Sequence, residues 1–484
     1  MSAKISNLSE LTPLVGSQEK ISDGVLGFIG QFNVGQLMRP LSRFKIKGIQ
    51  LKIVLSALIM SRFRGLSVYA MCQSGQLQID ENTLYRMMNH FWMNWRSLLY
   101  GIAMQFIRIT KQHGQSNNEV KCFVIDDTDI VKTGATIEGI SKIRSHVSHC
   151  YHLGFKMLLL AYWDGKSLLA LDFSLHRENR KNKFGLTDKQ TKAQFSKKRS
   201  ADSPGADRVQ ELDQEKPSIV LQMLKRACRH GISAAYVLMD SWFTNDTLIQ
   251  GIRKMRQGAM HVVGACKMDR RKFMVNGKEL NSATLVKANE TRKGKKHYSR
   301  KFKSEYMIVD AIYKGTPVRL YYIRYRRSKD WKLLLSTDTS LSFVRVMELY
   351  QIRWTIEVMF KECKQYLRLG QGQNTDFDGQ VADAALTMIT HTILSLQLRF
   401  KDYETMGGLF RDTQNRMVEE TLYRRIMQAI LSIIEQLLEI LSIDIDETIS
   451  LLIEDSDKNQ KVINLLISVS QASTINIRSE MVAR

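Results

Sequence analysis

Two short apolar runs that end in acidic residues restrict what the centre of this chain can form. FVIDDTD carries Asp126, Asp127 and Asp129, and YVLMDSWF carries Asp240. Apolar runs of roughly four to eight residues between polar turns are typical of buried strands. We therefore expect two strands that deliver carboxylates at their ends.

The residues between these runs predict a sheet around them. GFKMLLLAYWDG and SLLALDFSLH are further apolar runs, and SIVLQMLKRACRHG, which has helical spacing, precedes the run that ends at Asp240. Such runs with a helix before the last one indicate a buried mixed sheet. We therefore expect an α/β domain that starts near residue 120.

Carboxylates that leave buried strands need compensation for the water they lose. A cation or a hydrogen bond typically provides it. Two such strands side by side would bring Asp126 and Asp240 together and recruit a hard divalent ion. Phosphoryl transfer needs this chemistry, because two Mg²⁺ ions about 3.5–4 Å apart are held by a few carboxylates.

The stretch YQIRWTIEVMFKECKQYLRLG, residues 350–370, predicts an amphipathic helix. At about 100° per residue, Tyr350, Arg353, Glu357 and Lys364 fall within roughly a 60° sector. One interpretation is a solvated face on which Glu357 pairs with Arg353 or Lys361. In the other, Glu357 is a third metal ligand, its basic neighbours hold DNA phosphates and Tyr350 donates to a phosphate oxygen.

The charge of the whole chain indicates a polyanionic partner. The 484 residues include 71 Lys and Arg against 48 Asp and Glu, a net charge of +23, and a nucleic acid is the commonest partner of such a protein. The first residues lack a signal pattern, and the apolar stretch 422–443 is interrupted by Glu435 and Glu439, so we expect no membrane span. Six scattered cysteines suit a cytoplasmic protein.

We expect three regions along the chain. Residues 1–115 are predicted to be helical, either a helix-turn-helix-like DNA reader with Thr83, Tyr85 and Arg86 on one helix or an all-α packing domain. Residues 116–375 hold the α/β domain, with a β-rich insertion at about 260–340, and residues 376–484 are helical. Residues 177–216, polar and basic, are expected to be a mobile loop that either follows a phosphate backbone or merely adds solubility.

The acidic motifs and the 350–370 stretch together resemble a known family. FVIDDT, LMDSWF and Tyr350-x2-Arg353-x3-Glu357-x6-Lys364 resemble the DDE transposases of bacterial insertion sequences, in the group named for that Tyr-Arg-Glu-Lys signature. The resemblance covers roughly residues 120–375. It implies a multidomain α/β protein with a ribonuclease H-like mixed sheet flanked by helices, a helical N-terminal DNA-binding domain and a helical C-terminal dimerisation region.

The resemblance also implies a site and its cofactor. Asp126, Asp240 and Glu357 would bind Mg²⁺, with Mn²⁺ as a substitute, and Asp126 is preferred to Asp127 because Asp126 and Thr128 fit the Asp-x-Ser/Thr pattern of the family. Tyr350, Arg353 and Lys364 would contact DNA. Trp331, which precedes Tyr350 by about twenty residues, would stack on a flipped base, unless it is a core residue beside a strand.

The function implied is cut-and-paste transposition. The protein would bind double-stranded DNA at the terminal inverted repeats of its element, cut the ends through a hairpin and join them to target DNA. It would act as a homodimer in the bacterial cytoplasm, at the nucleoid. The alternatives are a catalytically inert DNA-binding relative and a plain ribonuclease H-like nuclease.

One cluster of potential metal ligands is discounted. SHVSHCYH holds His146, His149, Cys150 and His152 on one short segment. The usual two-pair spacing of zinc ligands is missing, so we do not expect zinc there. We expect instead that one of these histidines lies near the catalytic pocket.

Overall fold

The computed structural model describes most of the chain between residues 32 and 411. The described residues are 32–38, 48–63, 66–73, 79–114, 119–145, 148–178, 183–325, 328–400, 405–406, 408–409 and 411. Nearly all of them belong to one compact unit, Gln31–Phe410. The apolar stretch 422–443 and most of the region 376–484, predicted to be helical, lie outside the described residues.

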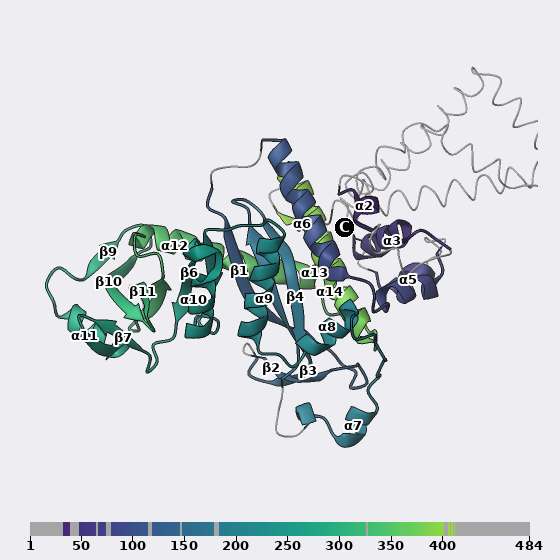
Figure 1. Cartoon of the computed structure of the whole chain (residues 1–484), viewed down its shortest axis with the longest axis horizontal. Helices are drawn as coiled ribbons and strands as arrows, with labels where there is room; N and C mark the ends of the chain where they lie inside the picture. The colour runs from purple at the N-terminus through teal and green to yellow at the C-terminus, as the bar shows by residue number, and fades with distance from the viewer. Residues whose placement is uncertain are drawn as a thin grey trace, which may run out of the picture. The chain divides into compact units, whose positions relative to one another are not determined.

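Helices form the N-terminal part of this unit (Figure 1). They are α2 (Val34–Met38), α3 (Leu51–Phe63), α4 (Val68–Gln73), α5 (Glu81–Met88) and α6 (Trp95–Gln112). In α6, apolar residues recur at helical spacing and are buried, and the Asn94 side chain accepts a hydrogen bond from Ser97 N at 2.9 Å. This N-cap satisfies one of the free amides at the start of the helix and sets where α6 begins.

The centre of the unit is a mixed sheet. Its first strands are β1 (Cys122–Val131), β2 (Ser141–Arg144), β3 (Tyr151–Trp163), β4 (Leu168–His176), β5 (Tyr236–Met239) and β6 (His261–Cys266). β3 is antiparallel to β1 and β4, whereas β5 is parallel to both β1 and β6. The strand order β4-β3-β1-β5-β6 is consistent with a ribonuclease H-like core.

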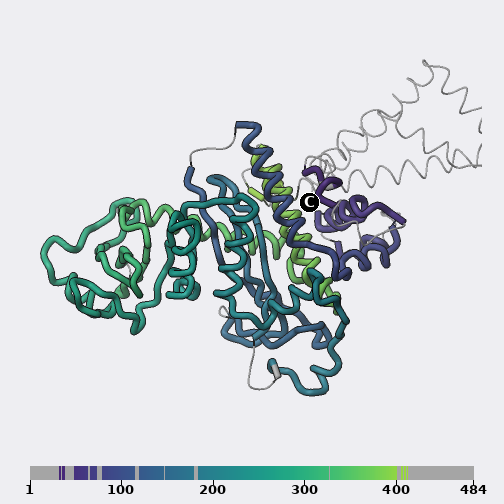
Figure 2. Tube along the Cα trace, in the orientation of Figure 1, coloured from purple at the N-terminus to yellow at the C-terminus, as the bar shows by residue number. Residues whose placement is uncertain are grey.

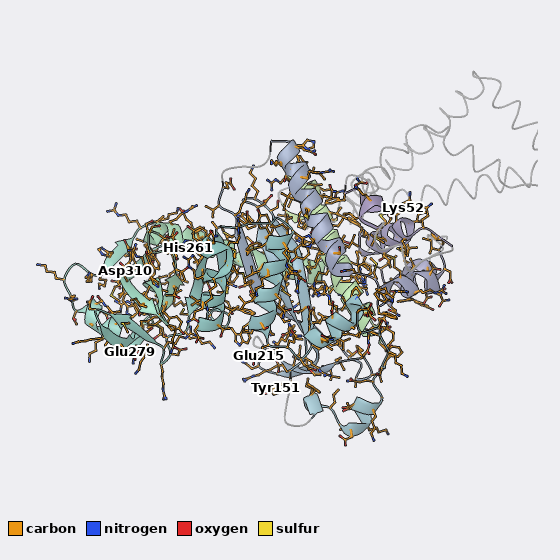
Figure 3. The ribbon with its side chains drawn as sticks, viewed as in Figure 1. Lys52, Tyr151, Glu215, His261, Glu279 and Asp310 are labelled. Atoms are coloured by element: carbon orange, nitrogen blue, oxygen red, sulfur yellow. The ribbon has the colours of Figure 1, made fainter. Side chains whose placement is uncertain are left out.

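A second set of strands continues the same sheet beyond β6. It comprises β7 (Lys272–Val275), β8 (Lys278–Asn281), β9 (His297–Ser299), β10 (Ser304–Tyr313), β11 (Thr316–Tyr325) and β12 (Lys332–Ser336), with α11 (Ser282–Glu290) after β8. Glu279 and Asp310 mark β8 and β10 in Figure 3. Since β6 pairs with β5 as well as β12, the strand-rich addition begins only after Cys266, within the predicted range of about 260–340.

Helices cover both faces of the central strands (Figures 1 and 2). They are α9 (Lys216–Arg229) and α10 (Asp246–Arg253), followed after the added strands by α12 (Phe343–Ile352), α13 (Trp354–Gln365) and α14 (Phe377–Phe400). α9 contacts β3 and β4 on one face, and α13 contacts β1 and β4. The 350–370 stretch, predicted as one helix, is two helices that meet at Arg353, although this residue keeps helical backbone angles.

The helix α14 is the most buried helix of the central region. By length and composition it would be long and apolar enough to cross a membrane, but 94% of its most apolar window is buried within the fold. It contacts α3, α5, α6 and β4. These contacts are those of a core helix, which removes its apolar side chains from water in the protein itself.

The segment expected to be a mobile basic loop is folded where it is described. Residues 183–216 contain the short 3₁₀ helix η4 (Lys183–Gly185), α7 (Asp188–Lys192) and α8 (Pro204–Glu211). Its charges do not all face solvent, because Lys197 and Arg199 bind carboxylates of other segments. The sequence could not reveal these partners, since Asp376 is 179 residues from Lys197 and Glu138 is 61 residues from Arg199.

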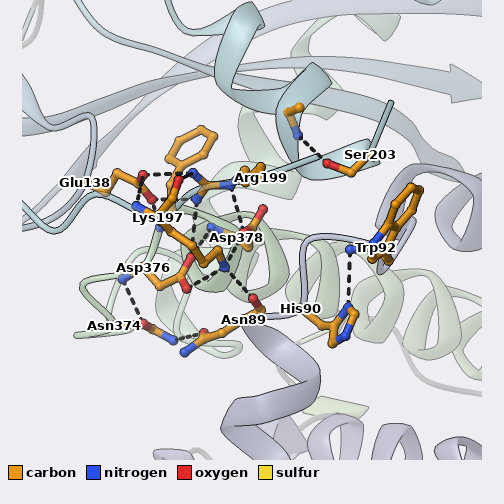
Figure 4. Close-up of polar contacts among 12 residues, drawn as sticks. Asn89, His90, Trp92, Glu138, Lys197, Arg199, Ser203, Asn374, Asp376 and Asp378 are labelled. Carbon is orange, nitrogen blue, oxygen red and sulfur yellow. Dashed lines mark hydrogen bonds and ion pairs between the residues drawn. The ribbon is translucent and has the colours of Figure 1, made fainter. Parts of the chain in front are cut away.

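Lys197 and Arg199 belong to a group that we call the ionic cluster (Figure 4). Arg199 Nη2 lies 2.6 Å from Glu138 Oε2, and Arg199 Nε lies 3.0 Å from Asp378 Oδ2. Lys197 Nζ lies 2.6 Å from Asp376 Oδ2 and 2.5 Å from Asp378 Oδ2. The ionic cluster therefore joins residues 195–200 to the start of α14.

Candidate active site

Asp126 and Asp240 lie next to each other on parallel strands. Ile125 of β1 is in register with Met239 of β5. Asp126 is the residue after Ile125 within β1, and Asp240 is the first residue after the end of β5. Asp240 follows the last residue of β5, as predicted. Asp126, however, is in the middle of β1, which continues to Val131 along β3 instead of ending at the acidic residues.

The side chain of Asp240 is held by the turn that follows β5. Its Oδ1 accepts hydrogen bonds from the backbone amides of Trp242 at 2.9 Å and Phe243 at 3.0 Å. The Thr244 hydroxyl donates to the Asp240 carbonyl at 2.6 Å. Bonds that fix one carboxylate oxygen in this way leave the other oxygen to face a ligand.

Arg353 bridges Asp126 and Glu357. Its Nη1 donates to Asp126 Oδ2 at 3.0 Å, and its Nη2 donates to Glu357 Oε1 at 2.5 Å. Arg353 is 8% exposed, so it is not part of a solvated row of charges. The i,i+4 pair of Arg353 and Glu357 is one of the two interpretations of the sequence, and it is present. The contact with Asp126 extends it into a bridge between α13 and β1.

The electrostatic environment of Asp126 favours its protonated form. Burial, and next the charge of Asp240, raise the pKa of this carboxyl to about 7, against the lowering effect of the Asp127 amide and Arg353. A buried carboxyl beside a second carboxylate is a site that lacks positive charge. A divalent cation would supply it.

The three carboxylates line one cleft, of about 1440 Å³, which we call the acidic cleft. Its lining residues are Asp126, Asp127, Thr128, Lys156, Glu178, Glu215, Lys216, Pro217, Asp240, Ser241, Trp242, Phe243, Asn245, Lys267, Arg353, Glu357, Phe360, Lys361, Lys364 and Gln365. Glu215, labelled in Figure 3, lies directly before α9. Acidic and basic side chains thus share the walls of this cleft.

Several lysines of the acidic cleft are bound to its acidic or hydroxyl side chains. Lys364 Nζ donates to Thr128 Oγ1 at 2.7 Å. Lys216 binds Asp127 from the start of α9, which is the opposite face of the sheet from α13. Asp127 thus differs from Asp126 in its partners, since Asp126 faces Arg353 and Asp240.

Comparison of the sequence with protein families identifies the family of this chain. The family model of the DDE superfamily endonucleases matches residues 44–306, which is more than half of the chain. The chain belongs to the DDE superfamily endonuclease family. No curated protein matches it. Membership in this endonuclease family indicates nuclease-type or transposase-type activity on DNA and, in general, a requirement for divalent metal.

The match of the DDE endonuclease model ends before α12 and α13. It therefore includes Asp126 and Asp240 but not Glu357. The fold brings the third carboxylate to the other two, because α13 packs on β1. Arg353, directly before α13, contacts Asp126, and Lys364 of α13 contacts Thr128.

The donor set of this DDE endonuclease suits a hard cation. Asp126, Asp240 and Glu357 offer carboxylate oxygens, the ligands that Mg²⁺ prefers. Within the described ranges no group of three His, Cys, Asp or Glu stands close enough to hold a metal as the side chains lie. Glu357 is held by Arg353, so a complete ligand set would require Glu357 to exchange this partner for the ion.

Two aromatic residues of the predicted site do not line the acidic cleft where it is described. Tyr350 is near the end of α12, where the Arg353 guanidinium carbon lies 5.5 Å from its ring centre, and burial raises the pKa of its hydroxyl to about 12. Trp331 directly precedes β12 in the strand-rich addition and stacks against Arg324 at 4.5 Å. Neither is among the described lining residues.

Trp242 is an aromatic residue of the acidic cleft that was not predicted from the sequence. It is 45% exposed, and Lys216 Nζ lies 5.2 Å from its ring centre. The signal was its place two residues after Asp240, in the turn that leaves the sheet edge. The histidine cluster gives no such residue, since His149, Cys150 and His152 do not line the cleft and His146 is outside the described residues.

Proposed function

We propose that this DDE endonuclease is a cut-and-paste DNA transposase of a bacterial insertion sequence, in the Tyr-Arg-Glu-Lys group. It binds the terminal inverted repeats of its element as double-stranded DNA, cleaves the ends, through a hairpin, and joins them to target DNA. The observation that carries the proposal is the meeting of Asp126 and Asp240 with Glu357 in one cleft that also holds basic side chains.

Asp126, Asp240 and Glu357 are the proposed metal ligands. When bound, Mg²⁺ or Mn²⁺ supplies activation of the attacking oxygen and stabilisation of the leaving oxygen. The turn after β5 orients Asp240 through two backbone amides, and the Asp127 amide holds one oxygen of Asp126 at 2.8 Å. These bonds reduce the reorganisation needed when the carboxylates bind an ion.

The basic side chains of the acidic cleft would hold the DNA backbone. Lys267 and Lys361 are exposed residues of the cleft lining and suit phosphate contacts. Lys364 would also bind a phosphate once it gives up its hydrogen bond to Thr128. Arg353 would bind DNA less directly, because its guanidinium already binds two carboxylates. Trp331 is proposed to contact DNA from the strand-rich addition.

The three regions of the chain would have separate roles in transposition. Residues 1–115 would bind the element ends, 116–375 would cut them, and 376–484 would join two copies in a synaptic homodimer. The protein would work in the cytoplasm, at the nucleoid, without a membrane partner. The net charge of +23 supports a DNA partner.

The decisive experiment compares wild type with Glu357→Gln on a DNA fragment that carries one end of the element, with Mg²⁺ added. We expect Glu357→Gln to retain end binding and to lose more than about a hundredfold in cleavage, since even the loss of a residue behind a metal ligand costs about 10–100-fold. The matched control is Glu362→Gln, on the same helix, because Glu362 faces His391 at 3.0 Å and does not line the acidic cleft.

The products distinguish the alternatives. Cleavage followed by joining to a second DNA supports a transposase, whereas cleavage without joining indicates a plain ribonuclease H-like nuclease. End binding without cleavage by wild type would indicate an inert DNA-binding relative. Equal cleavage by wild type and Glu357→Gln would remove Glu357 from the metal site.

A further inference from the structure

The strand-rich addition carries a dense run of positive charge. Residues 291–303, TRKGKKHYSRKFK, hold seven lysine and arginine residues and no aspartate or glutamate. We call them the basic segment. It includes β9 and the turn into β10, and none of its residues lines the acidic cleft where that cleft is described.

The basic segment is ordered by its contacts with β10 and α12. β9 pairs with β10 in antiparallel register. The turn between these strands packs against the start of α12, where the rings of Phe302 and Phe343 meet edge to face at 6.0 Å. Lys301 Nζ lies 2.5 Å from Glu348 Oε1, also on α12. A surface that is ordered in this way loses less conformational entropy when it binds a partner.

The acidic side chains beside the basic segment are already occupied. Lys296 Nζ lies 3.1 Å from Glu305 Oε1, and Arg324 Nη2 lies 2.7 Å from the other oxygen of Glu305. Glu290, directly before the segment, is 2.8 Å from Arg324 Nη1. These carboxylates therefore neutralise Arg324 and one lysine of the segment, and Glu348 neutralises another.

Five positive charges of the basic segment remain without a counter-charge. Each of these side chains is exposed, and none forms an ion pair with another part of the chain that the structure describes: Arg292, Lys293, Lys295, Arg300 and Lys303. Like charges gathered on a small surface repel each other, and a polyanion relieves this repulsion. Unpaired lysines and arginines on an exposed surface suit the phosphate backbone, which they bind without reading the base sequence.

α12 connects the basic segment to the acidic cleft, since it leads from the strand-rich addition to α13 (Figure 1). Glu348, the partner of Lys301, is nine residues before Glu357, and Arg353 between them keeps helical backbone angles. At 1.5 Å per residue, the two glutamates are roughly 14 Å apart along the helix axis. One turn of a DNA duplex spans about 34 Å. A duplex that leaves the acidic cleft along α12 would therefore meet the basic segment within one turn.

We propose that the basic segment holds backbone phosphates of the same DNA duplex that is cut in the acidic cleft, within one helical turn of the cleaved bond. The inference rests on the proposed function, which makes DNA the substrate of the acidic cleft. Because the contacts are to phosphates, they position the duplex and add affinity without adding a preference for sequence.

The test is binding of a labelled duplex of about 20 base pairs, unrelated to any element, to the full chain at about 50–200 mM NaCl. Fluorescence anisotropy is measured in EDTA, which prevents cleavage. Lys293→Gln, Lys295→Gln and Arg300→Gln are combined in one variant. We expect weaker binding and a dependence of log affinity on log salt that is shallower by about 2–3, since each phosphate contact contributes about 0.9 to the slope.

The matched control combines Lys111→Gln, Lys225→Gln and Arg229→Gln. It removes the same charge from exposed residues of α6 and α9 and should change the slope by less than about 1. Equal slopes for wild type and the basic-segment variant would overturn the proposal. Equal reductions in both triple variants would also overturn it, because net charge alone would then explain the effect. Should the triple variant not fold, Arg300→Gln alone should lower the slope by about 0.9.

The number of duplexes bound shows whether the basic segment and the acidic cleft share one DNA molecule. With a shared duplex, the basic-segment variant binds as many duplexes per chain as wild type, but more weakly. If the variant binds the first duplex as tightly as wild type and lacks a further binding event, the segment holds a separate DNA molecule, which overturns the proposal.

This experiment is independent of cleavage and of recognition of element ends. A protein that shows the expected change of slope but does not cut DNA would overturn the proposed function and leave the phosphate contacts of the basic segment in place. A protein that cuts and joins DNA, with equal slopes for wild type and variant, would support the proposed function and overturn the role of the basic segment.

Discussion

Arg353 shows at the scale of a residue what the sequence could and could not predict. Its spacing from Glu357 predicted an ion pair within one helix, and that pair is present at 2.5 Å. Its second partner, Asp126, is 227 residues earlier in the chain, so no local pattern could reveal it. The pairing also explains how a charged residue can be buried beside β1, since both terminal nitrogens of the guanidinium meet a carboxylate.

His176 allows a test of how burial affects ionisation in the same sheet. Burial, and next the charge of Lys216, lower the pKa of His176 to about 4. Between pH 4 and 6.5 the unfolded chain therefore binds a proton that the folded chain does not, so stability falls as the pH is lowered through this window. His176 should account for roughly 2–3 kcal/mol of the loss between pH 7 and pH 4.5.

The measurement is urea unfolding of wild type and His176→Gln at both pH values. The variant should lose less stability on acidification than wild type, because glutamine does not titrate. Ser174→Ala, which removes the hydroxyl 2.7 Å from His176 Nε2, tests whether the hydrogen bond alone is responsible. Identical pH dependence of wild type and His176→Gln would show that His176 titrates normally.

At the scale of elements, the sequence predicted which segments form strands but not where the strands end. The runs that predicted β1, β3, β4 and β5 all form strands, because apolar side chains at these positions need a buried sheet. β1 extends past its acidic residues since Asp127 and Asp129 bind Lys216 and Lys156, which the sequence does not place beside them. Residues 183–216 fold for the same reason, through partners that are remote in sequence.

Close packing between β6 and the turn after β5 makes Gly264 sensitive to substitution. A Cβ at Gly264 would lie 2.2 Å from Thr244 Oγ1, the hydroxyl that donates to the Asp240 carbonyl. We expect Gly264→Ala to lower the free energy of unfolding by about 1–3 kcal/mol through overpacking. Because the turn also holds the Asp240 side chain, cleavage should decrease more than the stability loss alone explains.

Gly134→Ala is the control for this substitution. The nearest heavy atom to a Cβ at Gly134 is 4.0 Å away, so the added methyl has room. Thermal unfolding and cleavage assays on both variants provide the comparison. A Gly264→Ala protein as stable and as active as Gly134→Ala would mean that Thr244 moves without affecting Asp240.

At the scale of the whole molecule, contacts between distant segments hold the described unit together. α14 lies against α3 and α6 from the first hundred residues as well as against β4. Arg62 of α3 and Asp383 of α14 form a buried ion pair at 2.5 Å. The sequence predicted boundaries near residues 115 and 375 from changes in composition, and composition carries no information on which helices pack across them.

Breaking the pair of Arg62 and Asp383 should destabilise this unit strongly. Asp383→Asn leaves the buried Arg62 without its counter-charge, so we expect a loss of about 3–5 kcal/mol in the free energy of unfolding. Arg62→Met combined with Asp383→Leu removes both charges and should recover much of the loss. Urea unfolding of Arg62→Met, Asp383→Leu and the double variant completes the cycle, and additive effects would show that the two residues do not interact energetically.

The pairing of β6 with β12 has a consequence for how this protein can diverge. The chain leaves the central strands at Cys266 and returns at Leu333, which is directly opposite Cys266 in the sheet. Everything between these two points is inserted where a short hairpin turn would suffice. The strand-rich addition can therefore become longer or shorter, or be replaced by another insertion, without a change in the central strands. The carboxylates of β1, the turn after β5 and α13 would keep their positions.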